Sequence, residues 1–140
     1  MTINELQDEV IEDFDLFDDW MDKYEYLIEL GKKLPMIDEQ YKTDDYLIKG
    51  CQSKVWLRAD VKDGLVQFTA DSDAVITKGI ISLLIRVLSG HQAQEIEKAD
   101  LYFIDQIGLK EHLSPNRSNG LVSMIKQMKL YALTFGRTGK

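Results

Sequence analysis

The stretch from Val75 to Leu88 constrains the fold most, because its apolar side chains cover most of the circumference of a helix. A helix that is apolar on nearly all sides must be buried, so the rest of the chain has to surround it. Residues 71–73 (Asp-Ser-Asp) precede it with short polar side chains that suit its first free N–H groups, and Ser89-Gly90 ends it. Gly79 in its interior costs about 1 kcal/mol relative to alanine. That cost predicts close approach of another element, which we expect to be the sheet.

A β-hairpin is predicted on either side of Asp63-Gly64, since Asp-Gly supplies the positive φ of a tight turn. The run from Lys54 to Asp60 alternates apolar and polar side chains, as a half-buried strand does. The run from Leu65 to Ala70 is the returning strand. A further short strand is predicted at residues 46–48.

Other helical stretches are predicted at residues 3–14, 20–30, 92–99 and 101–107, and from Ser114-Pro115 onward. Asp18 or Asp19 is the expected N-cap of the second of these, and the tail after Gly136 is expected to fray. No repeat, low-complexity segment or linker divides the chain, so we expect one domain spanning residues 1–140.

The composition excludes several function classes. The chain has 140 residues, 44% hydrophobic and 29% charged, which is typical of one soluble globular domain. No apolar run approaches the length of a membrane span, and a net charge of −7 argues against non-specific nucleic-acid binding. The acidic N-terminus lacks the pattern of a signal peptide, so we expect a cytoplasmic protein.

Charge is spread unevenly along the chain. Residues 1–25 carry ten acidic side chains and one basic one, whereas residues 110–140 carry six basic and one acidic. Solvated helix faces of opposite sign are one explanation. The other is that one end steers a charged partner protein.

Cys51 is the only cysteine and the candidate for chemistry. A single cysteine excludes an intrachain disulfide and a thiolate-rich zinc or iron–sulfur site within one chain. Gly50 before it permits a bend that other residues resist. Lys49 and Lys54 would favour the nucleophilic thiolate if they lie near the sulfur. The competing interpretations are an inert thiol packed in the core and a thiol that joins another chain.

Gln52 and Ser53 are candidates to hydrogen-bond a thiolate or persulfide, although satisfying the turn backbone is the alternative role. Arg117 lies in or just before the first turn of the last helix, where the helix dipole disfavours a cation. This placement suggests contact with an anion or a partner carboxylate, and the alternative is a salt bridge to Asp71 or Asp73. Asp73 itself is expected to cap the central helix rather than act as a base.

His91 and His112 show no metal-ligand spacing. A dyad of Cys51 with His112 stays open, because such partners are adjacent in space rather than in sequence.

Residues 48–56, Ile-Lys-Gly-Cys-Gln-Ser-Lys-Val-Trp, resemble the signature of the SufE family of cysteine desulfuration proteins. Further matching segments keep the family's order and together cover roughly residues 14–134; they lie at residues 23–31, 34–35, 71–74, 78–79 and 113–121. Two positions depart from the pattern. Lys54 stands where glutamine or another neutral polar residue is expected, and Asn116 stands where threonine or serine is common.

The resemblance implies an α+β domain, with a short antiparallel sheet of about three strands packed by helices, similar to iron–sulfur scaffold proteins of the IscU type. It also implies that Cys51 takes persulfide sulfur from a pyridoxal-phosphate (PLP) cysteine desulfurase of the SufS or CsdA type and stimulates that enzyme. The sulfur would then pass to a SufB-type scaffold or another acceptor. Supporting or partner-binding roles are implied for Gly50, Gln52, Ser53, Asp73 and Arg117.

The PLP belongs to the partner, so this chain is expected to hold no cofactor and no metal. It is also expected to bind no nucleic acid or membrane, and to be a monomer or weak homodimer. Two other function classes stay open. One is a stand-alone hydrolase or transferase with Cys51 as nucleophile and His112 or His91 as base. The other is an adaptor whose cysteine is core packing.

Overall fold

The computed structural model describes residues 1–138, and its elements surround helix α3. In chain order they are α1 (Ile3–Asp15), α2 (Trp20–Lys32), the 3-10 turns η1 (Glu39–Tyr41) and η2 (Asp44–Tyr46), β1 (Val55–Lys62), β2 (Leu65–Ser72), α3 (Val75–Leu88), α4 (Ala93–Lys98), α5 (Phe103–Gln106), the 3-10 turn η3 (Lys110–His112) and α6 (Pro115–Thr138). The α+β class implied by the resemblance is confirmed.

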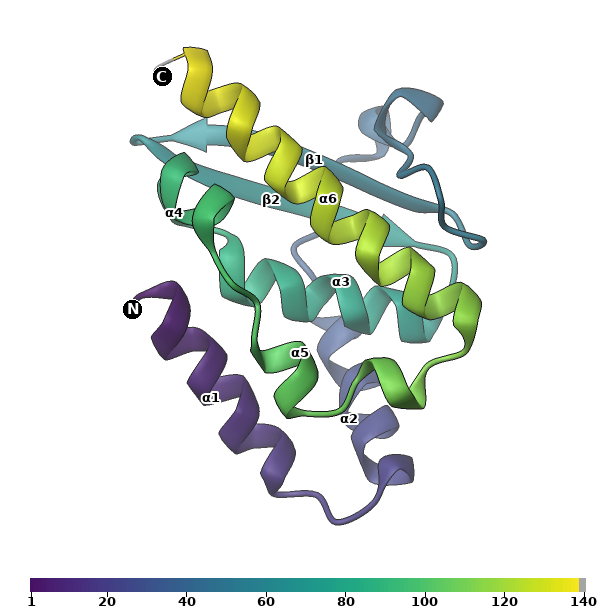
Figure 1. The fold of residues 1–140 in the computed structure, drawn as a ribbon. Helices are drawn as coiled ribbons and strands as arrows, with labels where there is room; N and C mark the ends of the chain where they lie inside the picture. The colour runs from purple at the N-terminus through teal and green to yellow at the C-terminus, as the bar shows by residue number, and fades with distance from the viewer. Residues whose placement is uncertain (139–140) are drawn as a thin grey trace.

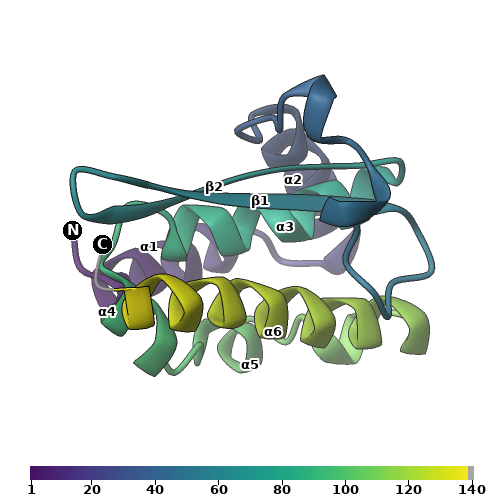
Figure 2. The ribbon, with the colours of Figure 1, turned by 90° about the horizontal axis from the view of Figure 1, so that it is seen from above.

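Helix α3 is the central buried helix, as the sequence predicts. It contacts α1, α2, α6 and strand β2, and ten of its fourteen residues are buried. Helices α3 and α6 lie under the hairpin, with α1 and α5 farther from it (Figure 1, Figure 2). The core is therefore shared between the inner face of the hairpin and the helices around α3.

Strands β1 and β2 form an antiparallel hairpin in which Val55 faces Ser72 and Lys62 faces Leu65. Asp63 and Gly64 form its turn with φ of 55° and 78°, the left-handed values that such a turn requires.

The predicted count of about three strands is wrong for the described chain, in which the sheet has two. Residues 46–48 form no strand: Tyr46 ends η2, and Leu47 makes one isolated bridge to Trp56. The Ile48 N–H still donates to the Val55 carbonyl, 2.8 Å away. Gly50 then turns the chain away with a φ of 92°. This turn ends the pairing before a third strand can form.

Two helix starts expected from the sequence, those of α2 and α6, are confirmed. Asp19 caps α2, accepting a 2.9 Å hydrogen bond from the Asp22 N–H, and Pro115 is the first residue of α6. The tail that is expected to fray after Gly136 begins inside α6, since Arg137 and Thr138 continue the helix. Residues 139–140 lie outside the described part of the chain.

Two expectations about α3 are corrected. Ala74 is its N-cap and makes no side-chain cap hydrogen bond; Asp71 and Ser72 belong to β2, and the Asp73 carboxylate accepts from the Lys54 N–H at 3.1 Å. Asp73 therefore ties α3 to the start of β1 instead of capping the helix. The close approach at Gly79 is real, but it comes from α2 and not from the sheet, because a Cβ there would overlap the Leu27 carbonyl.

Among residues 1–138, no helix is both long enough and apolar enough to cross a membrane.

Candidate functional site

Cys51 lies on the loop between η2 and β1, which reaches from the sheet to α6 (Figure 2). Gly50 turns this loop with a φ of 92°, a region that favours glycine. The loop sits closely on α6: a Cβ on Gly50 would lie 2.5 Å from Ser123 Oγ. The Cys51 thiol donates to the Gly120 carbonyl, with Sγ and O 3.7 Å apart. Small residues on α6 thus allow the cysteine loop to dock against it.

Cys51 lines a pocket of about 330 Å³, which we call the Cys51 pocket. Its lining comes from the cysteine loop, from α3 and from the segment that begins α6: Cys51, Gln52, Ser53, Thr77, Ile80, Ser114, Asn116, Arg117, Gly120 and Met124. Gln52, Ser53 and Arg117, which the sequence singled out, are therefore brought together with Cys51. Asp73 is not among the lining residues.

A hydrogen bond between Asn116 and Gln52 joins the cysteine loop to the first turn of α6. The Asn116 side-chain amide donates to Gln52 Oε1 at 2.7 Å. Within residues 1–138, neither Gln52 nor Ser53 hydrogen-bonds to the Cys51 sulfur. Sequence reasoning gave Asn116 no role. The one signal was that asparagine departs from the family pattern there.

Burial raises the pKa of the half-buried Cys51 thiol above its ordinary value. Lys49 and Lys54 are expected to favour the thiolate only if they lie near the sulfur, and in this conformation neither contributes to the pKa shift, which burial alone causes. Both lysine side chains are exposed. Burial in the docked loop therefore disfavours the thiolate, which is the nucleophilic form of the sulfur.

Arg117 is exposed at the pocket and forms no ion pair within residues 1–138. The predicted alternative, a salt bridge to Asp71 or Asp73, is wrong. Asp71 is paired instead with Lys42 and with Lys78, whose Nζ is 3.3 Å from Oδ1. Contact of Arg117 with an anion remains a prediction.

Neither histidine lines the Cys51 pocket. His91 is buried, with Nδ1 3.2 Å from the Leu88 carbonyl and Nε2 2.9 Å from the Met1 carbonyl. His112 stacks on Trp20 with ring centroids 4.0 Å apart. The structure thus brings no histidine base to Cys51, and no group of three metal-binding side chains forms within residues 1–138.

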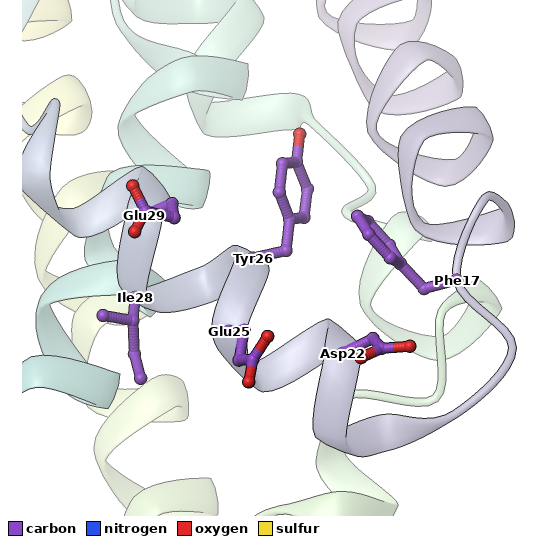
Figure 3. A pocket seen from close by; sticks show the side chains of 6 residues that line it. All are labelled: Phe17, Asp22, Glu25, Tyr26, Ile28 and Glu29. Carbon is purple, nitrogen blue, oxygen red and sulfur yellow. The ribbon is translucent and has the colours of Figure 1, made fainter.

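A second hollow, of about 450 Å³, lies on the outer side of α2 (Figure 3). Its lining residues are Phe17, Asp22, Glu25, Tyr26, Ile28 and Glu29. It shares no residue with the Cys51 pocket and holds no thiol. The Cys51 pocket is the candidate site because, of the hollows found among the described residues, it is the one that the cysteine lines.

The fold and site define an α+β protein built around one pocket-lining cysteine. A family model described as "SufE: Fe-S metabolism associated domain" matches residues 8–132. The chain belongs to the SufE family, which confirms the resemblance seen in the sequence.

Two relatives and one solved structure are similar to this chain. A SufE-like protein of Rhizobium meliloti is 43% identical over 127 residues, covering 87% of this chain and 91% of that protein. SufE-like protein 1, chloroplastic/mitochondrial, of Arabidopsis thaliana is 44% identical over 112 residues, covering 79% of this chain but 30% of that longer protein. The solution structure of a hypothetical protein from Thermus thermophilus has a TM-score of 0.76 at 21% identity, covering 92% of this chain and 94% of that one. That structure shares the fold.

Proposed function

We propose that this protein is a sulfur acceptor, which takes persulfide sulfur from a PLP-dependent cysteine desulfurase onto Cys51 and stimulates that enzyme. It then relays the sulfur to an iron–sulfur assembly scaffold. One observation carries the proposal: in a SufE-family chain the only cysteine stands on a glycine-made turn at the wall of a pocket. The proposal places the protein in the cytoplasm, as a monomer or weak homodimer.

The transfer is a thiol–disulfide type exchange. The Cys51 thiolate attacks the terminal sulfur of the donor persulfide and forms a new S–S bond to it. The S–S bond of the donor breaks, and the donor cysteine leaves as a thiolate. The proton lost by Cys51 is available to that thiolate, so the step needs no added oxidant or reductant. The PLP stays with the donor, where it supports release of sulfur from free cysteine.

The surroundings of Cys51 suit a carrier that hides its sulfur between encounters. A persulfide must be kept from oxidants and stray thiols, and Cys51 is half-buried against α6, where burial raises the pKa of its thiol. The Asn116–Gln52 hydrogen bond helps to hold the loop there. It joins exposed side chains, so its net contribution is only about 1 kcal/mol. We therefore expect docking of the desulfurase to release the loop.

The loop movement is testable by hydrogen exchange. Adding the desulfurase should change exchange across residues 46–56, whereas unchanged exchange there would count against a released loop.

The function is tested by intact-mass measurement. Wild-type protein and Cys51→Ser are each incubated with a SufS- or CsdA-type desulfurase and free cysteine, with controls that omit either. Wild type should gain the mass of sulfur only in the complete mixture, and Cys51→Ser should gain none. No gain on wild type, or an equal gain on Cys51→Ser, would overturn the proposal.

A further inference from the structure

The residues that line the Cys51 pocket include one cation, Arg117, and no carboxylate, although the whole chain has a net charge of −7. Ser114 and Asn116 also line it, so the pocket borders the beginning of α6. The dipole of a helix N-terminus favours negative charge. At this terminus Pro115 has no N–H, and the Arg117 N–H donates to Ser114 Oγ, 3.3 Å away.

Thr77 gives an independent indication of a ligand. Its side chain lines the pocket and is 6% exposed, yet its hydroxyl makes no hydrogen bond within residues 1–138. Every fully buried side-chain oxygen or nitrogen within the described residues has a hydrogen-bond partner. The unpaired Thr77 oxygen is therefore an accessible part of this otherwise buried side chain, and it faces the pocket. Ser82, also buried on α3, instead donates to the Leu30 carbonyl at 3.0 Å. The Thr77 hydroxyl is thus available as a donor to a group in the pocket.

The pocket combines these donors with a sulfur nucleophile. Its volume of about 330 Å³ is at the small end of ligand sites, which suits a compact molecule. An anion in it would meet Arg117, the start of α6 and Thr77 while lying beside the Cys51 sulfur.

We propose that the Cys51 pocket binds a small oxyanion bearing a transferable sulfane sulfur, of the thiosulfate type, and that Cys51 takes this sulfur without a partner protein. The inference rests on the proposed function, because the acceptor atom is the same. It adds a second, small-molecule class of donor.

The transfer needs no reactant besides the Cys51 thiolate and thiosulfate. After loss of its proton to solvent, the Cys51 sulfur attacks the outer sulfur of thiosulfate and forms the S–S bond of a persulfide. The S–S bond of thiosulfate breaks, and its electron pair leaves with sulfite. No histidine base is required.

The test uses the full-length protein alone with thiosulfate, and measures persulfide by intact mass together with released sulfite. Wild type should gain one sulfur per released sulfite, with a rate that saturates in thiosulfate, and Cys51→Ser should gain none. Arg117→Ala should lower the rate at low thiosulfate by about tenfold, the effect of one charge-assisted hydrogen bond. Arg137→Ala removes a cation from the last turn of α6 and should leave the rate unchanged.

Binding is tested separately from transfer. At constant ionic strength, sulfate should slow alkylation of Cys51 by neutral iodoacetamide in wild type and in Arg137→Ala. It should protect less in Thr77→Val, which keeps the shape of the side chain and removes the hydroxyl. Equal protection or equal transfer rates in wild type, Arg117→Ala and Thr77→Val would overturn the anion site.

The desulfurase reaction, run in parallel, separates the two proposals. Sulfur on Cys51 from the desulfurase but none from thiosulfate overturns this inference and leaves the proposed function standing. Sulfur from neither donor overturns both.

Discussion

Replacing Gly50 with alanine should push the cysteine loop off α6. The φ of 92° at this position costs an L-residue about 1–2 kcal/mol. The new Cβ would also lie 2.5 Å from Ser123 Oγ and 3.4 Å from Ser123 Cβ, so the hydroxyl must move aside. A penalty of 1–2 kcal/mol on the docked loop corresponds to about 5–30-fold more of the released form. Alkylation of Cys51 at fixed pH should accelerate by that factor.

Two controls separate the backbone strain at Gly50 from the contact of the new Cβ with Ser123. Gly64 in the hairpin also has a positive φ, of 78°, and has no atom near its missing Cβ, so Gly64→Ala introduces backbone strain without touching the loop. It should lower the unfolding temperature and leave alkylation unchanged. Ser123→Ala in the Gly50→Ala background should remove only the contact part of the effect. If Gly50→Ala is alkylated at the wild-type rate, Gly50 does not hold the loop closed.

Three further outcomes follow from the same geometry. Because burial raises the pKa of Cys51, the pH midpoint of its alkylation should lie above that of the urea-unfolded protein; an equal or lower midpoint would contradict the buried thiol. Burial alone would raise the pKa of Asp71, but hydrogen bonds from Lys42, the Ser72 N–H and Lys78 lower it. The stability from this depressed pKa is therefore present above the ordinary carboxyl pKa and lost as pH falls through the folded value. Asp71→Asn should lower the free energy of unfolding in urea by about 1–3 kcal/mol at neutral pH. In the variant this free energy should also fall less steeply as the pH is lowered into the acid range, and an equally steep fall would contradict the role of Asp71. Gly79→Ala should destabilise by about 1–3 kcal/mol because its Cβ overlaps the Leu27 carbonyl; the helix-propensity gain of about 1 kcal/mol would appear instead if α2 were not packed there.

Features that depend on neighbouring residues were predictable from the sequence. The Asp63-Gly64 turn, the Asp19 cap and the start of α6 at Pro115 each follow from the conformational preferences of one or two residues. The burial of α3 was predictable because its apolar side chains cover most of the helix surface. Cys51 stood out as the only cysteine, after a glycine that does adopt a positive φ.

Features that depend on distant contacts were not predictable. Gly79 signals close approach, but nothing local says that the neighbour is α2 rather than the sheet. Residues 46–48 look like a strand locally, yet a strand needs a partner, and the turn at Gly50 ends the pairing after Ile48. The Asn116–Gln52 hydrogen bond joins residues 64 positions apart. The lysines beside Cys51 suggest a stabilised thiolate, whereas burial of the sulfur favours the neutral thiol.

Sulfur transfer to Cys51 is tested by following one labelled sulfur atom through a single turnover. The desulfurase is loaded with isotopically labelled persulfide, freed of excess cysteine and mixed with an equal amount of this protein, and both chains are peptide-mapped under non-reducing conditions. The label should leave the desulfurase and appear on the peptide that contains Cys51. Label that stays on the desulfurase, or is released as sulfide without passing through Cys51, would contradict the account.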